Sequence, residues 1–247
     1  MFSLAATLAL ALAASCGPPP LSERPWGPGE RLNFDVHALG ATQKSGLSLV
    51  VDPVPVEGSP AAMRLAAAAT FRSPFYKVRG AAQSWIDART LLPTRFHDES
   101  SDGKSRSTDS QLDRPGPVVR VNWVNGGKRG MNGFLRGPAV LDLLSALYYL
   151  RAARLVAGTA FCFDVVGGRT YWRLSGHVQP GTEETKAPAG RADAIRLDGV
   201  AVQSDDPSRR YQLHLWLSAD ARRLPVAMTI ETRLGRVRAA LASAGVP

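Results

Sequence analysis

The sequence of 247 residues is poor in the side chains from which proteins build metal and redox sites. It contains two cysteines, Cys16 and Cys162, and only four histidines. Metal sites made of paired cysteines need more thiols than this. No two histidines have the spacing of a helical zinc motif. The sequence therefore predicts no metal site and no cofactor.

Sequence motifs of common enzymes are missing as well. There is no Gly-x-Ser-x-Gly elbow of the esterases, and Gly126-Gly127-Lys128 lacks the spacing of a phosphate-binding loop. A polar cluster of His97, Asp98, Glu99 and Asp102 could hold a cation or serve acid–base chemistry, but we interpret it as a solvated hairpin end. No catalytic residue is assigned. A hydrolase with an unrecognised site stays an alternative, because carboxylate pairs are defined by distance in space.

The charge is strongly basic but dispersed. The net charge is +9, from 30 basic and 21 acidic residues, and arginine supplies nearly all of the positive charge. The closest clusters are pairs such as Arg209–Arg210 and Arg222–Arg223. Nucleic-acid-binding modules carry basic runs or interleave basic and aromatic residues. The pattern predicts no nucleic-acid partner.

The N-terminus predicts export. Phe2 to Ala14 is almost wholly apolar, but it is shorter than the ~20 residues that span a bilayer. It is typical of a secretory signal, which we assign to residues 1–15. The boundary Leu12-Ala13-Ala14-Ser15-Cys16 resembles the lipobox of bacterial lipoproteins, which makes Cys16 the predicted lipid-attachment site. Ordinary signal peptidase is the alternative, since Ala13 and Ser15 are small residues at the required offsets.

These features place the protein in the bacterial cell envelope, on the periplasmic side of a membrane. An acylated Cys16 would anchor it to the membrane surface. Residues 16–29 are rich in Pro and Gly and are expected to form an extended, solvated tether. Residues 30–247 form one domain. Cys162 lies in the apolar run Ala160–Phe163 and is expected to be a packed, unreactive thiol.

The dominant pattern after Glu30 has a period of two, which predicts half-buried β-strands. Apolar and polar residues alternate in five segments, at 32–36, 119–123, 170–174, 211–217 and 226–230. Turn residues separate such runs at 125–128, 167–168 and 101–104. His37, His177 and His214 fall on the polar positions of such strands and are expected to be solvated. The fold class is mainly β: a single curved antiparallel sheet or half-barrel, built as a meander.

One segment, 138–154, is predicted to be a buried helix. Pro138 suits a first helical turn, and Arg151 and Arg154 suit the C-terminal end of the helix dipole. Apolar residues cover most of its circumference, so it should lie in the hollow of the curved sheet. Leu147 is expected near the centre of the apolar arc.

Two segments repeat one hairpin pattern, at 85–93 and at 216–225. Each runs from Trp through a polar turn with Asp and Arg to Leu-Pro, where Pro opens the next strand. With the helix between them and Trp26-Gly27-Pro28-Gly29-Glu30 before them, these hairpins resemble the bacterial family called domain of unknown function 3108. They are also similar to the lipoprotein-carrier superfamily, which comprises the Lol carriers and periplasmic sigma-regulator sensors. That likeness implies a curved sheet with helices in an apolar concavity.

No activity transfers with the first resemblance. The carrier likeness implies non-catalytic binding of an apolar or amphipathic ligand, such as a lipid or a lipoprotein tail. The alternative is a structural or partner-docking protein of the envelope. A deep apolar site not filled by the helix would favour ligand binding, and a filled concavity would favour docking.

Overall fold

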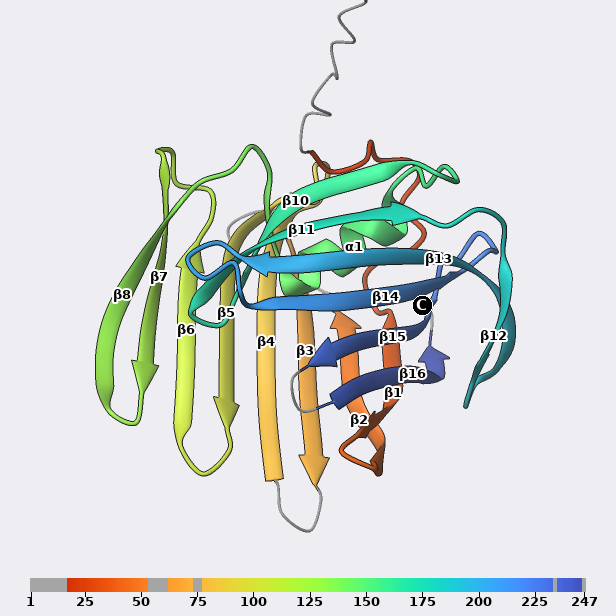
Figure 1. The fold of residues 1–247 in the computed structure, drawn as a ribbon, viewed down its shortest axis with the longest axis horizontal. Coiled ribbons are helices and arrows are strands. Elements are labelled where there is room, and N and C mark those ends of the chain that lie inside the picture. The colour runs from red at the N-terminus through yellow and green to blue at the C-terminus, as the bar shows by residue number, and fades with distance from the viewer. Residues whose placement is uncertain (1–16, 53–61, 73–76, 233–234, 246–247) are drawn as a thin grey trace, which may run out of the picture.

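The computed structural model describes residues 17–52, 62–72, 77–232 and 235–245 (Figure 1). These described residues form sixteen strands and one helix. The strands of the N-terminal half are β1 (Arg31–Ala38), β2 (Ala41–Val51), β3 (Ala62–Arg72), β4 (Lys77–Asp87), β5 (Pro93–Ser101), β6 (Ser105–Gln111), β7 (Val118–Asn125) and β8 (Lys128–Leu135). Then follow β9 (Val140–Asp142), helix α1 (Leu143–Ala152), β10 (Ala160–Gly167), β11 (Thr170–Val178), β12 (Glu183–Ala187), β13 (Gly190–Gln203), β14 (Arg210–Ser218), β15 (Pro225–Thr232) and β16 (Gly235–Gly245).

All sixteen strands belong to one open, strongly curved sheet, as predicted. Its order is β8-β7-β6-β5-β4-β3-β2-β1-β16-β15-β14-β13-β11-β10-β9, with β12 paired to β13. Nearly every pair along this path is antiparallel and joins neighbours in the chain. The exceptions are the β1–β16 pairing of the first and last strands, the β11–β13 pairing, which skips β12, and the parallel β9–β10 pair.

The sheet folds over on itself into two layers (Figure 1). We call β1–β8 the N-terminal layer and β9–β16 the C-terminal layer. The strands of the C-terminal layer run across those of the N-terminal layer, with α1 between them. One hydrophobic core is shared by both layers and the helix, and contains for example Phe34, Phe96, Leu141 and Leu217. The predicted helix in the hollow of a curved sheet is confirmed.

The helix begins later than predicted. Residues 140–142, expected inside it, form β9, which pairs with β10. α1 spans Leu143–Ala152, so the predicted bounds 138–154 are too wide at both ends. Within the helix Leu150 is buried, whereas Leu147 is only half-buried and Leu143 is exposed. Among the described residues, no helix is long and apolar enough to cross a membrane.

Two buried charges hold α1 in place. Arg151, in its last turn, donates from Nη1 and Nη2 to the two carboxylate oxygens of Glu30, at 2.6 and 2.8 Å. Both side chains are essentially inaccessible, at 0% and 1% exposure. The guanidinium also donates to the carbonyl oxygens of Arg222 and Arg223 and lies 5.1 Å from the centre of the Tyr148 ring. Because Glu30 precedes β1 and Arg222–Arg223 form the β14–β15 turn, this cluster ties the helix to both layers.

The repeated hairpin pattern folds the same way twice, at β4–β5 and at β14–β15. In both, a register shift follows the Trp, between Trp85 and Ile86 and between Trp216 and Leu217. The turn Asp of each hairpin accepts backbone N–H bonds. The residue two positions before each Pro, Leu91 or Arg223, has a positive φ. The two segments that are similar in sequence therefore also have the same backbone conformation.

The segment predicted as a solvated tether lies along α1 instead. The Pro20 carbonyl accepts from Arg154 N–H, Ser22 N–H donates to Ala152, and Tyr149 Oη donates to the Pro19 carbonyl. Trp26 is buried, and its indole N–H donates to the carbonyl of Tyr148 at 3.0 Å. The segment is extended, as expected, but its hydrogen bonds go to the helix.

A second joint connects the β10–β11 turn to the N-terminal layer. Gly168 N–H donates to Asp98 on β5 at 2.9 Å, and the Arg169 guanidinium stacks on Trp123 of β7. Trp123 lies flat across Gly130, where a Cβ atom would come within 2.3 Å of the indole. Gly130 is therefore needed at that point for close approach.

We predict that Glu30→Gln lowers the free energy of unfolding by about 3–5 kcal/mol, because it leaves the Arg151 charge buried without its partner. Chemical denaturation measures this. Glu184→Gln is the control, because it breaks the exposed Glu184–Arg191 pair and should cost at most about 1 kcal/mol. Equal small losses in both variants would show that the buried pair does not hold the helix.

Candidate functional site

The start of α1 is a buried polar cap. Asp142 Oδ1 accepts the backbone N–H groups of Leu144 and Ser145, each at 2.9 Å, and Ser145 Oγ accepts the N–H of Asp142 in return. Ser84 of β4 donates to Asp142 Oδ2 at 2.6 Å. Burial raises the pKa of Asp142 to about 6, although these hydrogen bonds oppose the shift. The cap thus fixes the helix against the N-terminal layer through a carboxyl group with a perturbed pKa.

The C-terminal layer presents a row of apolar side chains to the interior. Leu197 of β13 is buried, and in register with it come Leu215 of β14, Met228 of β15 and Ala239 of β16. The last three pack against the core but are only half-buried. The row therefore becomes more accessible towards β16.

The N-terminal layer shows the same gradient. Leu49 of β2 is buried, and the residues paired across from it, Ala67 on β3 and Ala82 on β4, are half-buried members of the core. Leu47, two residues before Leu49 on β2, is also half-buried. We define the interlayer surface by seven of the half-buried core residues on both layers and on α1: Leu47, Ala67, Ala82, Leu147, Leu215, Met228 and Ala239.

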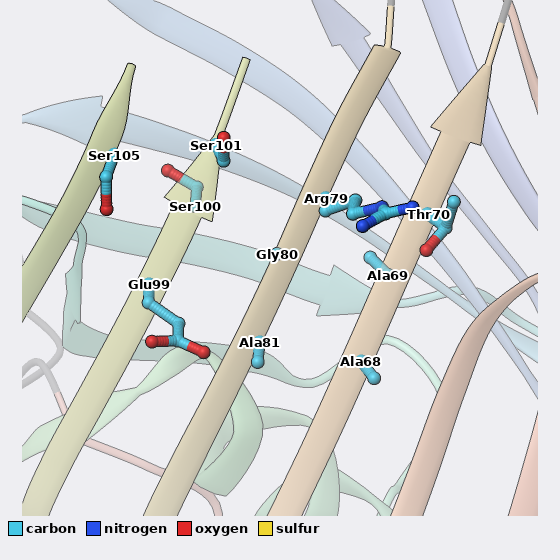
Figure 2. Close-up of a pocket in the computed structure, with 10 residues that line it drawn as sticks. All are labelled: Ala68, Ala69, Thr70, Arg79, Gly80, Ala81, Glu99, Ser100, Ser101 and Ser105. Carbon is cyan, nitrogen blue, oxygen red and sulfur yellow. The ribbon is translucent and has the colours of Figure 1, made fainter. Parts of the chain in front are cut away.

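A second candidate is an open trough over β3, β4 and β5 (Figure 2). Its lining is mostly small: Ala68, Ala69, Thr70, Arg79, Gly80, Ala81, Glu99, Ser100, Ser101 and Ser105. Arg79 and Glu99 are its charged side chains, and no histidine lines it. The trough does not bring together the His and carboxylate pair that an acid–base hydrolase would need.

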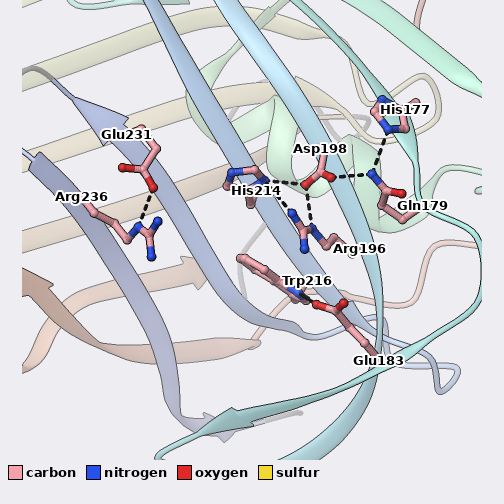
Figure 3. A network of polar contacts seen from close by, with 9 residues as sticks. All are labelled: His177, Gln179, Glu183, Arg196, Asp198, His214, Trp216, Glu231 and Arg236. Carbon is pink, nitrogen blue, oxygen red and sulfur yellow. Dashed lines mark hydrogen bonds and ion pairs between the residues drawn. The ribbon is translucent and has the colours of Figure 1, made fainter.

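A third candidate is a polar network on the outer side of the C-terminal layer (Figure 3). Asp198 accepts from Arg196 Nε at 2.8 Å, from Gln179 at 2.5 Å, and contacts His214 Nδ1 at 2.5 Å. Burial alone would raise the pKa of Asp198, but the hydrogen bonds from Arg196, His214 and Gln179 outweigh it and lower the pKa. His177 joins through Gln179 at 2.9 Å.

This network joins strands. Its members lie on or beside β11, β13 and β14, and no hydroxyl or thiol takes part among the nine residues drawn in Figure 3. The arrangement orients an imidazole but supplies no nucleophile beside it. His214, expected to be solvated, is in fact largely covered and engaged. His37 and His177 are exposed as predicted.

The predicted cluster of His97, Asp98, Glu99 and Asp102 does not converge. Successive strand residues face opposite sides of the sheet, so Asp98 reaches the β10–β11 turn while His97 lies on the other face, 3.5 Å from Asp109. Asp102 pairs with Arg106. Among the described residues, no group of three or more His, Cys, Asp or Glu side chains could hold a metal.

The sequence predicted a packed, unreactive free thiol at Cys162, and this prediction is wrong. Cys162 is part of a disulfide. The sequence contains one other cysteine, Cys16, which lies outside the described residues. The backbone N–H of Cys162 donates to the carbonyl of Gly17 at 3.1 Å, which brings the start of the described chain beside β10. A sulfur that carries a lipid cannot also form a disulfide, so lipidation of Cys16 and a bond between the two cysteines exclude each other.

The comparison with protein families decides the relationship. Residues 33–242 match the family described as "Protein of unknown function (DUF3108)". The chain belongs to this family. No curated protein matches the sequence of this DUF3108 member.

Two solved structures are similar to the chain at very low sequence identity. A beta-barrel-like protein of domain of unknown function DUF1849 from Brucella abortus is 12% identical with a TM-score of 0.56, over 94% of this chain and 100% of that one. A "putative lipoprotein" from Parabacteroides distasonis is 8% identical with a TM-score of 0.34, over 92% and 99%. The first shows that the fold of this DUF3108 chain occurs elsewhere.

We predict that Asp142→Asn changes how the stability of this DUF3108 protein depends on pH. Unfolding returns Asp142 to its ordinary pKa near 3.8, below the folded value of about 6. Between these values only the folded state keeps the proton, so stability falls as pH rises from about 4 to 6, by about 3 kcal/mol. Asn at position 142 can still cap the helix through its side-chain oxygen, but it has no carboxyl group to titrate.

The difference in unfolding free energy between wild type and Asp142→Asn, measured from pH 4 to pH 7, isolates this effect because other titrating groups cancel. A difference that is flat with pH would show that Asp142 titrates normally.

Proposed function

We propose that the protein is an exported cell-envelope protein that binds an apolar or amphipathic ligand of the acyl-chain class at the interlayer surface. The observation that carries the proposal is the half-burial of apolar side chains on both layers and on Leu147 of α1. A layered core would normally bury such residues fully. Here they stay accessible beside a continuous apolar interior, which is the chemistry that accepts a hydrocarbon chain.

Export has independent support. The apolar segment Phe2–Ala14 has the character of a signal, and disulfides such as that of Cys162 persist in oxidising compartments outside the cytoplasm. Anchoring through Cys16 stays a prediction. Because the chain from Gly17 to Trp26 contacts α1, an anchored form would hold the helix end of the domain close to the membrane.

The second candidate is docking to an envelope partner. The observation that favours it is the burial of α1, which fills the centre between the layers with Leu144, Tyr148 and Leu150. In the described part of the chain, a helix packed in this way occupies the centre between the layers, where a whole lipid would otherwise have to lie. Ligand binding at the interlayer surface would then involve an acyl chain rather than a complete headgroup.

We predict that a fluorescent fatty-acid probe binds the wild-type chain and that Ala82→Trp weakens this binding at least tenfold, because the indole occupies the interlayer surface. Ala81→Trp is the matched control. Ala81 is the preceding residue on β4 and lines the trough of Figure 2, on the opposite face.

The affinity of Ala81→Trp for the probe should stay within about twofold of the wild-type affinity. Loss of one apolar contact in a binding site would lower the affinity by more than this. Native mass spectrometry of the protein extracted from its own membrane would show a co-purifying lipid. A wild-type chain that binds neither probe nor lipid would favour the docking role.

We predict that Cys16→Ser abolishes labelling by a fatty-acid probe, whereas Cys162→Ser preserves the labelling. The intact mass separates the two states of the sulfur, since acylation adds the lipid and a disulfide removes two hydrogens. Labelling that survives Cys16→Ser would show that lipidation of Cys16 is wrong.

A further inference from the structure

The outer face of β7 and β8 departs from the alternation of apolar and polar residues that is expected of strands with one face towards water. On β7 and β8 the inward residues Val119, Val121 and Phe134 are buried. The outward positions should then be polar. Instead they include Val118, Met131 and Leu135, exposed by 37%, 58% and 82%.

These apolar residues share one surface. Val118 and Leu135 are directly paired, and Met131 lies two rows further along, opposite Asn122. Leu39, Leu92, Leu143 and Val156, the other large apolar residues exposed in the described chain, lie on other elements. β8 ends the sheet, as its place at the margin of Figure 1 shows, so no further strand covers this edge.

Cations surround the same residues. Arg120 lies between the Val118 and Asn122 rows, opposite Gly133, and Arg129 faces Val124 one row beyond Met131. Arg120 and Arg129 are exposed and form no ion pair among the described residues. The neighbouring acids are engaged: Asp109 on β6 binds Arg95 at 2.6 Å, and Asp102 binds Arg106.

We propose that the outer face of β7–β8, defined by Val118, Arg120, Arg129, Met131 and Leu135, docks on an anionic lipid bilayer surface. Charge complementarity selects this occupant. Unpaired cations attract acidic headgroups, and the exposed apolar side chains between them enter the boundary of the acyl chains. This contact is separate from an acyl group on Cys16 and from a ligand at the interlayer surface.

The test is co-sedimentation with vesicles of phosphatidylcholine rich in phosphatidylglycerol, compared with pure phosphatidylcholine. The full chain is produced in the cytoplasm, so that it carries no acyl group. We expect binding to the anionic vesicles that weakens as salt rises. Arg120→Gln with Arg129→Gln should lower it by about 30-fold, since each surface cation contributes about fivefold.

The double variant Met131→Ser with Leu135→Ser should lower vesicle binding about tenfold. The salt dependence of binding should stay as in the wild type, because this variant removes only the insertion of apolar side chains. The control pair is Leu39→Ser with Arg210→Gln, an exposed apolar residue and an exposed cation far from this face in sequence. Thermal melts verify that every variant folds. Absence of wild-type binding at low salt, or edge variants that bind like the control pair, would overturn the proposal. Binding to an acidic protein without binding to vesicles would assign the face to a protein partner and overturn it equally.

Discussion

The architecture depends on the buried contact between Arg151 and Glu30. Taking both charges out of water is expensive, and only close geometry with additional hydrogen bonds compensates for it. Here the guanidinium has two carboxylate oxygens, two backbone carbonyls of the β14–β15 turn and the Tyr148 ring. Partners 121 and 72 residues away in the sequence thereby meet at one point. A helix of ten residues is too short to be stable alone, so this contact fixes where α1 lies.

The position of α1 in turn determines what the layers can bind. The helix and its cap at Asp142 fill one part of the space between the layers, where the core residues are fully covered. In the rows that start at the buried Leu49 and Leu197, the later residues Ala82 and Met228 are only half-buried. The layers share one hydrophobic core with α1, and near the helix the charges and hydrogen bonds of Arg151, Glu30 and Asp142 add to it. Apolar surface next to such a joint is available for a ligand without loss of the joint itself.

Much of the fold was predictable, because strand periodicity and turn residues are local signals. The turn at Gly126-Gly127 and the two Trp hairpins folded as their residues predict. The start of the helix was not predictable. Val140-Leu141 is an apolar pair that suits a helix or a strand equally well, and only its pairing with β10 makes it a strand. Asp142 three residues before Ser145 is a capping signal that could have marked the boundary. The β1–β16 pairing, the Asp198 network and the disulfide of Cys162 depend on distant residues, and no local pattern reveals them.

The half-buried interior and the exposed apolar edge are departures from one rule, applied to opposite faces of the same sheet. In a sheet with one face towards water, inward apolar residues are expected to be buried and outward positions are expected to be polar and solvated. Ala82 departs from it on the inside and Leu135 on the outside. Neither departure helps the isolated chain to fold, because a core gains from full burial and an exposed Leu gains nothing. Sites where local rules fail without a gain in stability are where contacts with other molecules are expected. Because side chains on the two faces of a strand do not touch, a ligand inside and a surface outside can be bound at the same time.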